Sequence, residues 1–505
     1  MPKIAFLFLL VRNPNKIDEW IKFFKNANKK HFSIYVHCSF PNNITEPIFV
    51  KNLIKNIIPT RWGDISLVKA MINLLREAYK DPEITHFHFV SDSCVPLYPF
   101  CDTYNMMTKS NKSNIEYIID NERDNERDIR FNNYRQSQWI TLIRKHVEFF
   151  LSNDYTNMFI KCEIPDESYF INTLLYIKPN EKDRIIPESL TYVCWNCDVP
   201  RPKTYKTIDD NTISDVYSGN CLFMRKIDTL CPMKFIVYKS NLINYLEQYK
   251  NDKCVFAPVG GWAGDAFITI SAHNLFKKVG LNYEIYDSKK KYSYYKDCVF
   301  MVCGSGNLVN YYDSLSKSLS HWNETISFKK MIILPSTINA HFDVLNKLPD
   351  NTDIICRERI SYHLVKNNVL KKKVLLSDDL AFYFDITEWK NKEPIYNNLI
   401  SIRRDDESAY ISFNDMLPNG YINNDIAEEF LGKCKNFKET NDACYKFLET
   451  ISKYKTVYTN RLHTAIAAIL IGRSVYVFPN SYYKNRGVYK TSMYTYKNAL
   501  FVNKI

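Results

Sequence analysis

The sequence predicts an α/β protein composed of two or three globular units. Its 505 residues are more than one hydrophobic core usually organises. Hydrophobic residues make up 46% of the chain and aromatic residues 15%, which is well above the content of disordered proteins, so packed domains are expected throughout. Short apolar runs alternate with amphipathic stretches in both halves, as strands and helices do in an α/β sheet.

The first half contains one series of expected strands and helices. Strands are predicted at residues 4–11, 32–37 and 85–90, and helices at 17–27 and 67–79. Residues 109–135 are rich in Asn, Asp, Glu and Arg and carry a near-tandem Asn-Glu-Arg-Asp pair at 121–128, so a loop excursion is expected there. The series indicates a first domain over residues 1–235.

A second series begins near residue 240 and continues to the C-terminus. Strands are predicted at residues 255–258, 299–302, 330–334, 353–356, 399–402, 457–459 and 475–478, and the clearest helix at 266–278. This second domain, 240–505, is long enough for two Rossmann-like halves, at about 240–390 and 391–505. Glycines follow its apolar runs but form no complete dinucleotide fingerprint, so no nicotinamide cofactor is expected.

Charge and cysteine usage narrow the classes of partner. The formal net charge of +12 is scattered over the chain and matches no nucleic-acid motif, so nucleic acid is not expected as a partner, while anionic small substrates fit. The 14 cysteines lack the spacing of a disulfide framework, which favours a reducing compartment. One Cys-x-x-Cys occurs, Cys194 to Cys197, without a second pair at zinc spacing, so no metal site is expected.

Nothing in the sequence predicts a membrane span. The apolar run at residues 4–11 is too short to cross a bilayer and lacks a signal-peptide cleavage pattern. The 36 tyrosines and only 12 glycines are typical of AT-rich genomes, such as those of protists and giant viruses. We therefore expect a cytoplasmic protein, with a virus-infected host cell as one setting.

Five motifs follow one another in the first half. They are Trp-Gly-Asp-Ile-Ser at 62–66, Ser-Asp-Ser-Cys-Val-Pro-Leu at 91–97, Ser-Gln-Trp at 137–139, Pro-Asp-Glu-Ser-Tyr-Phe at 165–170 and Phe-Met-Arg-Lys at 223–226. With this ordered set, residues 1–235 resemble the core-2/I-branching N-acetylglucosaminyltransferase family. The resemblance implies a GT-A-like nucleotide-sugar domain that transfers a sugar, expected to be N-acetylglucosamine, from a UDP-sugar with inversion. It also implies that basic side chains replace a divalent metal ion.

The resemblance assigns roles to single residues, each with a structural alternative. Glu167 matches the family's catalytic base, which must take a proton from the attacking hydroxyl; alternatively, it favours a helix N-terminus. Lys226 matches the lysine that binds the diphosphate, with Arg225 beside it, and the alternative is a surface basic pair. Trp195 matches a tryptophan that lines the substrate site, although such a residue is more often buried.

Other positions in the first half leave the nucleotide and the sugar open. Asp64 and Asp92 are candidates for nucleotide or acceptor contacts. Relatives often carry an acidic residue for the uracil ring where this chain reads Val-His-Cys-Ser at 36–39, and many carry His-Pro where it reads Arg-Pro at 201–202.

A second ordered set of motifs occupies the C-terminal half. It comprises Gly-Asp at 264–265, Cys-Gly-Ser-Gly-Asn at 303–307, Leu-Pro-Ser-Thr-Ile at 334–338, Arg-Glu-Arg-Ile-Ser at 357–361, Ser-Asp-Asp-Leu-Ala-Phe at 377–382, Arg-Leu-His at 461–463 and Asn-Ser-Tyr-Tyr-Lys at 480–484. Residues 240–505 thereby resemble the polysaccharide pyruvyl transferase family. The resemblance implies a GT-B-like pair of Rossmann-like subdomains and phosphoenolpyruvate as the pyruvyl donor.

The clearest local signal of this half is a strand that leads into a helix near residue 460. The pattern predicts an Asn460 cap and a helix whose first turn carries Arg461 and His463, where a helix N-terminus already favours anions. His463 is the expected general acid or base, and Arg461 and Arg357 are expected to hold the donor's anionic groups. Lys484 adds a further positive charge. Asp265 and Asp379 have structural alternatives, as a helix cap and a loop anchor.

The two resemblances together predict a bifunctional enzyme that builds a pyruvylated glycan. Its expected partners are a nucleotide sugar, phosphoenolpyruvate and a glycan acceptor, and no cofactor is required. Two alternatives stay open: only one domain is active while the other binds the acceptor, or the chain is a glycan-binding protein without activity.

Overall fold

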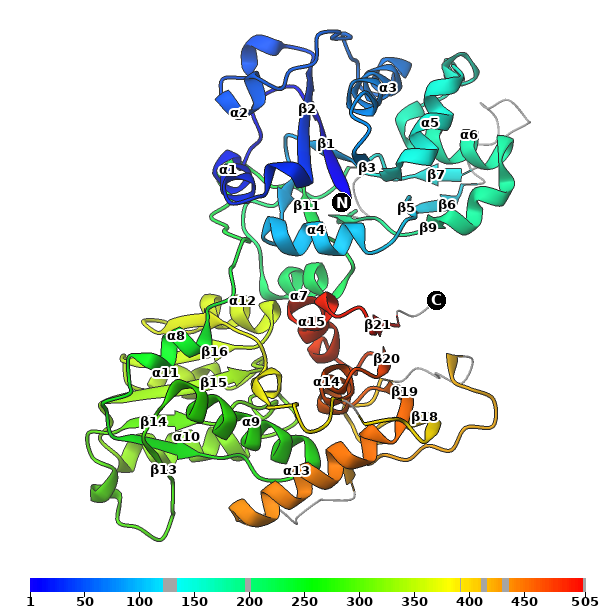
Figure 1. The fold of residues 1–505 in the computed structure, drawn as a ribbon. Coiled ribbons are helices and arrows are strands. Elements are labelled where there is room, and N and C mark those ends of the chain that lie inside the picture. The colour runs from blue at the N-terminus through cyan, green and yellow to red at the C-terminus, as the bar shows by residue number, and fades with distance from the viewer. Residues whose placement is uncertain (121–133, 196–200, 391, 410–415, 429–435, 503–505) are drawn as a thin grey trace. The chain divides into compact units, whose positions relative to one another are not determined.

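The computed structural model describes residues 1–120, 134–195, 201–390, 392–409, 416–428 and 436–502. The chain forms two compact units: the first comprises Met1–Asp209 and Gly219–Val237, and the second Asp210–Ser218 and Tyr238–Ile505. Helices and strands alternate in both units, which confirms the predicted α/β class (Figure 1).

A mixed six-stranded sheet forms the centre of the first unit, in the order β2-β1-β3-β8-β5-β9. Its first three strands are parallel and lie within two residues of the predicted ranges, while β8 joins them antiparallel. The strands of this sheet are β1 (Lys3–Leu10), β2 (Phe32–Cys38), β3 (Ile84–Ser91), β5 (Ser113–Asn114), β8 (Thr141–Ile143) and β9 (Ile185–Ile186). The helices of the first unit are α1 (Ile17–Lys25), α2 (Pro47–Val50), α3 (Ile65–Tyr79), α4 (Phe100–Thr108), α5 (Arg144–Ser152) and α6 (Tyr169–Ile177).

Two smaller sheets complete the described part of the first unit. One has the order β10-β11-β4 and joins Thr191–Val193, Phe223–Arg225 and Val95–Pro96. The other is an antiparallel hairpin of β6 (Tyr117–Ile119) and β7 (Tyr134–Gln136). The expectation of a loop over residues 109–135 was therefore wrong at its described ends, because strands of two or three residues are too short to show an apolar period. The tandem pair at 121–128 lies outside the described residues.

Aromatic side chains hold the core of the first unit together. Trp20 on α1 is fully buried and meets Phe8 on β1 edge to face, with ring centroids 5.0 Å apart. The Trp20 indole also donates a hydrogen bond to the carbonyl of Cys94 at 3.0 Å. This bond satisfies the polar atom of a buried ring and ties α1 to the segment that follows β3.

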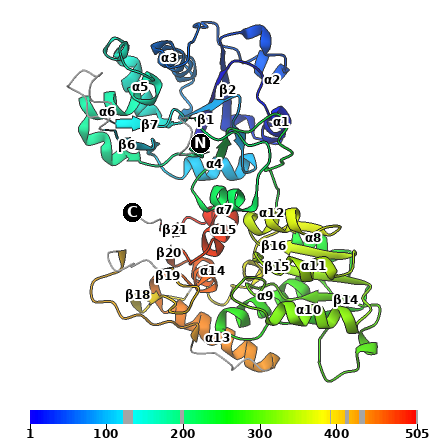
Figure 2. The same cartoon turned by 180° about the vertical axis from the view of Figure 1, so that it is seen from behind.

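The second unit contains two entirely parallel sheets. The first has the order β13-β12-β14-β15-β16-β17 and the second β18-β19-β20-β21. Figure 2 labels β14, β15 and β16 of the first sheet and all four strands of the second. The strands are β12 (Cys254–Ala257), β13 (Tyr283–Ile285), β14 (Val299–Val302), β15 (Lys330–Ser336), β16 (Thr352–Cys356), β17 (Lys373–Leu376), β18 (Tyr396–Ser401), β19 (Tyr454–Thr459), β20 (Ser474–Val477) and β21 (Ala499–Phe501). The sequence did not predict β13, β17 or β21, which are short edge strands.

Helices cover these parallel sheets, as crossover connections require. They are α7 (Asp210–Ser218), α8 (Leu242–Glu247), α9 (Ala263–Val279), α10 (Ser314–Thr325), α11 (Phe342–Lys347), α12 (Arg359–Asn368), α13 (Phe437–Ser452), α14 (Leu462–Ile471) and α15 (Lys484–Thr491). One apolar cluster includes Phe267 of α9, Phe447 of α13 and Ile466 of α14. It packs a helix of the first sheet against helices of the second, so the two sheets share a core.

Helix α7 departs from the predicted segmentation. It precedes β11 of the first unit in sequence but packs against α12 and α15 of the second. The Tyr217 hydroxyl lies 3.0 Å from Nε2 of buried His363, and the two rings stack. Asn368 also donates a hydrogen bond to Asp210 at 2.6 Å. These contacts are more than 140 residues apart in the chain, so local sequence patterns could not predict them.

The Tyr217 hydroxyl should contribute measurably to stability. Burial lowers the pKa of His363 to about 3, so the ring is neutral and its hydrogen bond to Tyr217 offsets the cost of burying a polar atom. Tyr217→Phe should lower the free energy of unfolding by about 1–2 kcal/mol, measured by urea denaturation. Tyr396→Phe, at an exposed strand position, is the matched control and should change it by less than about 0.5 kcal/mol. Equal effects of both variants would contradict this role.

Candidate active sites

In the first unit, Glu167 faces an arginine. It ends a short 3-10 turn, Pro165–Glu167, directly before α6, and its carboxylate accepts a hydrogen bond from Arg135 Nε of β7 at 3.1 Å. The Glu167 side chain is 17% exposed. The Ser168 side chain does not cap the N-terminus of α6, and the carboxylate of Glu167 is turned toward Arg135 of strand β7. A partly exposed carboxylate held in this way can accept a proton from a bound hydroxyl.

Two arginines of this site lie over tryptophan rings. The Arg135 guanidinium lies 5.4 Å from the centre of the Trp195 ring, and that of Arg225 lies 4.2 Å from the centre of the Trp139 ring. Trp195 is 48% exposed, so the alternative of a buried structural tryptophan is wrong. Arg135 connects the carboxylate of Glu167 with this exposed ring, a role that the sequence did not reveal because the three residues come from separate segments.

A pair of partly buried cations, Arg225 and Lys226, lies at the end of β11. Burial lowers the pKa values of Arg225 and Lys226, and the nearby carboxylate of Asp92 acts on both in the opposite direction. Burial raises the pKa of Asp92, whose side chain lies 3.7 Å from Arg12. Both cations are partly buried, so the description as a surface basic pair was wrong. Desolvated cations of this kind bind anionic groups such as a diphosphate strongly.

Asp64 has a clear structural role. It is the N-cap of α3, and its carboxylate accepts a hydrogen bond from the backbone N–H of Ser66 at 2.9 Å. The bonds to Ser66 lower the pKa of Asp64. A nucleotide contact of this exposed aspartate stays a prediction.

In the second unit, the residues of interest follow the carboxyl ends of the parallel strands. Arg357 comes directly after β16, His463 lies in the helix after β19, and Lys484 starts the helix after β20. Ligands of open α/β sheets bind at these strand ends. The structure thus brings together side chains from both sheets that lie up to 127 positions apart.

Buried Arg357 and Asp379 form one group with the partly exposed His463. Arg357 is 1% exposed and donates hydrogen bonds to Asp379 at 2.7 Å and to the Thr337 hydroxyl at 2.8 Å. The same Asp379 oxygen lies 3.6 Å from His463 Nε2. Although burial opposes ionisation, Arg357 and His463 hold the pKa of Asp379 well below its usual range. Asp379 also caps a short turn at Ala381, as its structural alternative proposed.

Glycine allows the helix start of α9 to approach His463. A Cβ atom on Gly264 would lie 2.9 Å from His463 Nδ1, closer than side chains tolerate. The neighbouring Asp265 accepts a hydrogen bond from the backbone N–H of Trp262 at 3.0 Å, which confirms its role as a helix cap. The start of α9, which belongs to the first sheet, thereby packs against His463 of α14, which belongs to the second.

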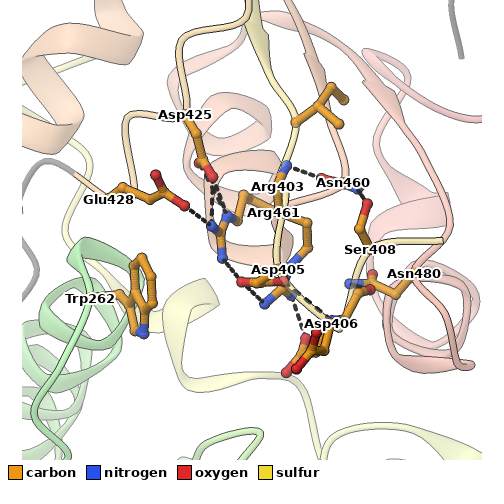
Figure 3. Close-up of polar contacts among 12 residues, drawn as sticks. Trp262, Arg403, Asp405, Asp406, Ser408, Asp425, Glu428, Asn460, Arg461 and Asn480 are labelled. Atoms are coloured by element: carbon orange, nitrogen blue, oxygen red, sulfur yellow. Dashed lines mark hydrogen bonds and ion pairs between the residues drawn. The ribbon is translucent and has the colours of Figure 1, made fainter. Parts of the chain in front are cut away.

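Arg461 is surrounded by carboxylates (Figure 3). Its guanidinium donates hydrogen bonds to Asp425 at 2.5 Å and to Asp405 at 3.1 Å, and lies 3.3 Å from Glu428. It also lies 5.0 Å from the centre of the Trp262 ring. Since its charge is already balanced, contact between Arg461 and an anionic donor stays a prediction.

The predicted helix start near residue 460 needs correction. Helix α14 begins at Leu462 with Arg461 in the N-cap position, and no side chain caps it. Asn460 instead accepts a hydrogen bond from the backbone N–H of Arg403 at 2.8 Å, and so joins β19 to the end of β18. A tertiary partner thus replaced the local cap.

The segment after β18 contributes charged residues that the sequence analysis missed. Arg403 forms a two-pronged pair with Asp405 at 2.6 and 2.8 Å, and it also donates to Glu407. Glu407 accepts a further hydrogen bond from Lys484. The run Arg-Arg-Asp-Asp-Glu at 403–407 directly after an apolar strand was the available signal.

No helix in the described part of the chain is long and apolar enough to cross a membrane.

Comparison with protein-family models divides the chain in two. Residues 4–218 match the model described as Core-2/I-Branching enzyme, and residues 263–482 match the model described as Polysaccharide pyruvyl transferase. The two matches do not overlap.

Individual relatives were also found. Glycosyltransferase BC10 of Oryza sativa subsp. japonica is 36% identical over 164 residues, which cover 30% of this chain and 41% of the relative. The chain therefore spans about two fifths of the length of this curated relative. A functionally uncharacterised protein of Klebsiella pneumoniae has a crystal structure that is 30% identical, covers 52% of this chain and 97% of its own, and gives a TM-score of 0.46. By the family matches, the chain carries a core-2/I-branching glycosyltransferase domain followed by a polysaccharide pyruvyl transferase domain.

Proposed function

We propose that the chain is a bifunctional enzyme whose first domain adds a sugar to a glycan and whose second domain attaches pyruvate to that sugar or to a neighbouring one. The observation that carries the proposal is the group of Arg357, His463 and Lys484, which the two parallel sheets of the second unit bring into one site. Cations suit the carboxylate and phosphate of phosphoenolpyruvate, and an imidazole suits proton transfer near neutral pH. The two parallel sheets support a GT-B-like arrangement.

The proposed pyruvyl transfer makes a ketal. The methylene carbon of phosphoenolpyruvate gains a proton from His463, the electrons of the double bond form the new C–H bond, and the neighbouring carbon becomes cationic. An acceptor hydroxyl adds to that carbon, phosphate leaves with the electrons of its C–O bond, and a second hydroxyl adds. The proton of one hydroxyl replaces the proton that His463 gave to the new methyl group. The proton of the other hydroxyl goes to the released phosphate. Arg357 and Lys484 hold the anionic donor during these steps.

In the first unit, the proposal assigns transfer from a UDP-sugar, with N-acetylglucosamine as the sugar, to a GT-A-like domain. Glu167 takes the proton of the attacking hydroxyl while Arg135 holds its carboxylate in place. Arg225 and Lys226 bind the departing diphosphate in place of a metal ion, and their partial burial strengthens this attraction. Exposed Trp195 offers its ring as a platform for a sugar.

His463 should be essential for the pyruvyl transfer. His463→Gln should lower acceptor-dependent phosphate release from phosphoenolpyruvate by about 100-fold or more, because it removes the proton donor. The measurement uses the full chain with a panel of acceptors that contain N-acetylglucosamine. His321→Gln changes an exposed histidine of α10 and should retain full activity. If wild-type protein releases no phosphate with any acceptor, the second unit is not a pyruvyl transferase on these sugars.

Glu167 should be essential for the sugar transfer. Glu167→Gln should reduce acceptor-dependent UDP release from UDP-N-acetylglucosamine by about 100-fold or more, since an amide cannot accept the hydroxyl proton. Donor binding, measured by calorimetry, should change little because Glu167 acts on the acceptor. Glu163→Gln, an exposed position four residues earlier, is the control. Full turnover in Glu167→Gln would show that this glutamate is not the base. If the wild type binds neither UDP-N-acetylglucosamine nor phosphoenolpyruvate, the alternative of a glycan-binding protein is favoured.

A further inference from the structure

Lys484 has a buried carboxylate partner that the proposed mechanism does not use. Glu407 lies in the segment after β18, and its Oε2 atom accepts hydrogen bonds from both Lys484 Nζ and Arg403 Nη1. The Glu407 side chain is 4% exposed and that of Lys484 is 9% exposed. One carboxylate oxygen therefore serves two buried cations.

Further charged groups face Lys484 from the other elements packed around it. Gly306, in the loop after β14, leaves room for two cations: a Cβ atom there would lie 3.2 Å from Arg357 Nη2 and 4.0 Å from Lys484 Nζ. Asp265 of α9 interacts electrostatically with Lys484 and with Arg357. The ring of Tyr482 lies 5.4 Å from the ammonium group. Within the described part of the chain, Lys484 thus interacts with two arginines and two carboxylates, and Glu407 contacts it directly.

The ionisation of this pair follows from its burial. Burial lowers the pKa of Lys484 to about 8, with Arg403 and Arg357 acting in the same direction and Glu407 acting against them. Although burial opposes it, Lys484 and Arg403 hold the pKa of Glu407 below its usual value, so Glu407 stays ionised at neutral pH. A hydrogen bond from Tyr312 also lowers the pKa of Glu407. Lys484 is therefore a cation at neutral pH, and it loses its proton as the pH rises through its pKa of about 8.

We propose that Glu407 is a positioning residue that keeps Lys484 charged and in place in the donor site, so that this pair sets an upper pH limit to donor binding. The inference rests on the proposed function, because the donor is phosphoenolpyruvate. As pH rises through the titration of Lys484, the site loses one positive charge and holds the donor less tightly. Without Glu407, no carboxylate of the described residues in direct contact with Lys484 offsets the repulsion of the ammonium group by the two arginines, and the limit moves to lower pH.

The test is binding of phosphoenolpyruvate to the full chain without acceptor, by calorimetry from about pH 7 to about pH 9.5, where the donor phosphate, with a second pKa of about 6, is fully ionised. In the wild type, the dissociation constant should rise about tenfold with a midpoint near pH 8. Glu407→Gln should move that midpoint down by about one pH unit or more. Lys484→Arg should abolish the rise, since arginine stays charged throughout this range.

The matched control is Asp406→Asn. It removes one negative charge from the neighbouring position of the same segment, where the side chain is exposed, and should retain the wild-type midpoint. A shift as large as that of Glu407→Gln would show that overall charge acts, not the contact with Lys484, and would overturn the inference.

The remaining outcomes separate the inference from the proposed function. Absence of phosphoenolpyruvate binding by the wild type at every pH would overturn both. If the dissociation constant rises with the same midpoint pH in wild type and in Lys484→Arg, the inference alone is overturned. This comparison can be made even if Glu407→Gln does not fold.

Discussion

A cation that is buried in a protein needs a carboxylate nearby, and this constraint organises the second unit. Arg357 is paired with Asp379, Arg461 with Asp425 and Asp405, and Lys484 with Glu407. Each pair joins segments that follow different strands. The positive charges that the proposed function assigns to donor binding are therefore the same charges that join the strand ends.

The first unit meets the same need in a different way. Two of its arginines lie over tryptophan rings, whose faces attract a cation without adding a negative charge. Arg225 lies over a ring and also interacts electrostatically with Asp92, while Arg135 combines a ring with the carboxylate of Glu167. The contrast fits the proposed chemistry: the first site would release a diphosphate, and the second would move protons on a bound anion.

Helix α7 gives the fusion a physical basis. A simple linker would leave each unit with only its own segments, but here the chain enters the second unit before it completes β11 of the first. The stacked pair of Tyr217 and His363 and the hydrogen bonds of Asp210 make that helix part of the second unit's packing. The two domains are thereby interleaved in sequence, although each has its own core.

The sequence by itself determined the α/β class and most of the long strands, and it named Arg357, His463 and Lys484 as candidates, because apolar period, glycine position and short motifs are local properties. Strands β1, β3, β14 and β16 lie within two residues of their predicted ranges. Only the tertiary structure decided the partners: the carboxylates around Arg461, the contact of Arg135 with Glu167, the place of Asn460 and the membership of α7. These depend on contacts between segments far apart in the chain, where the cost of burying a charge or a polar atom selects the partner and local propensity does not.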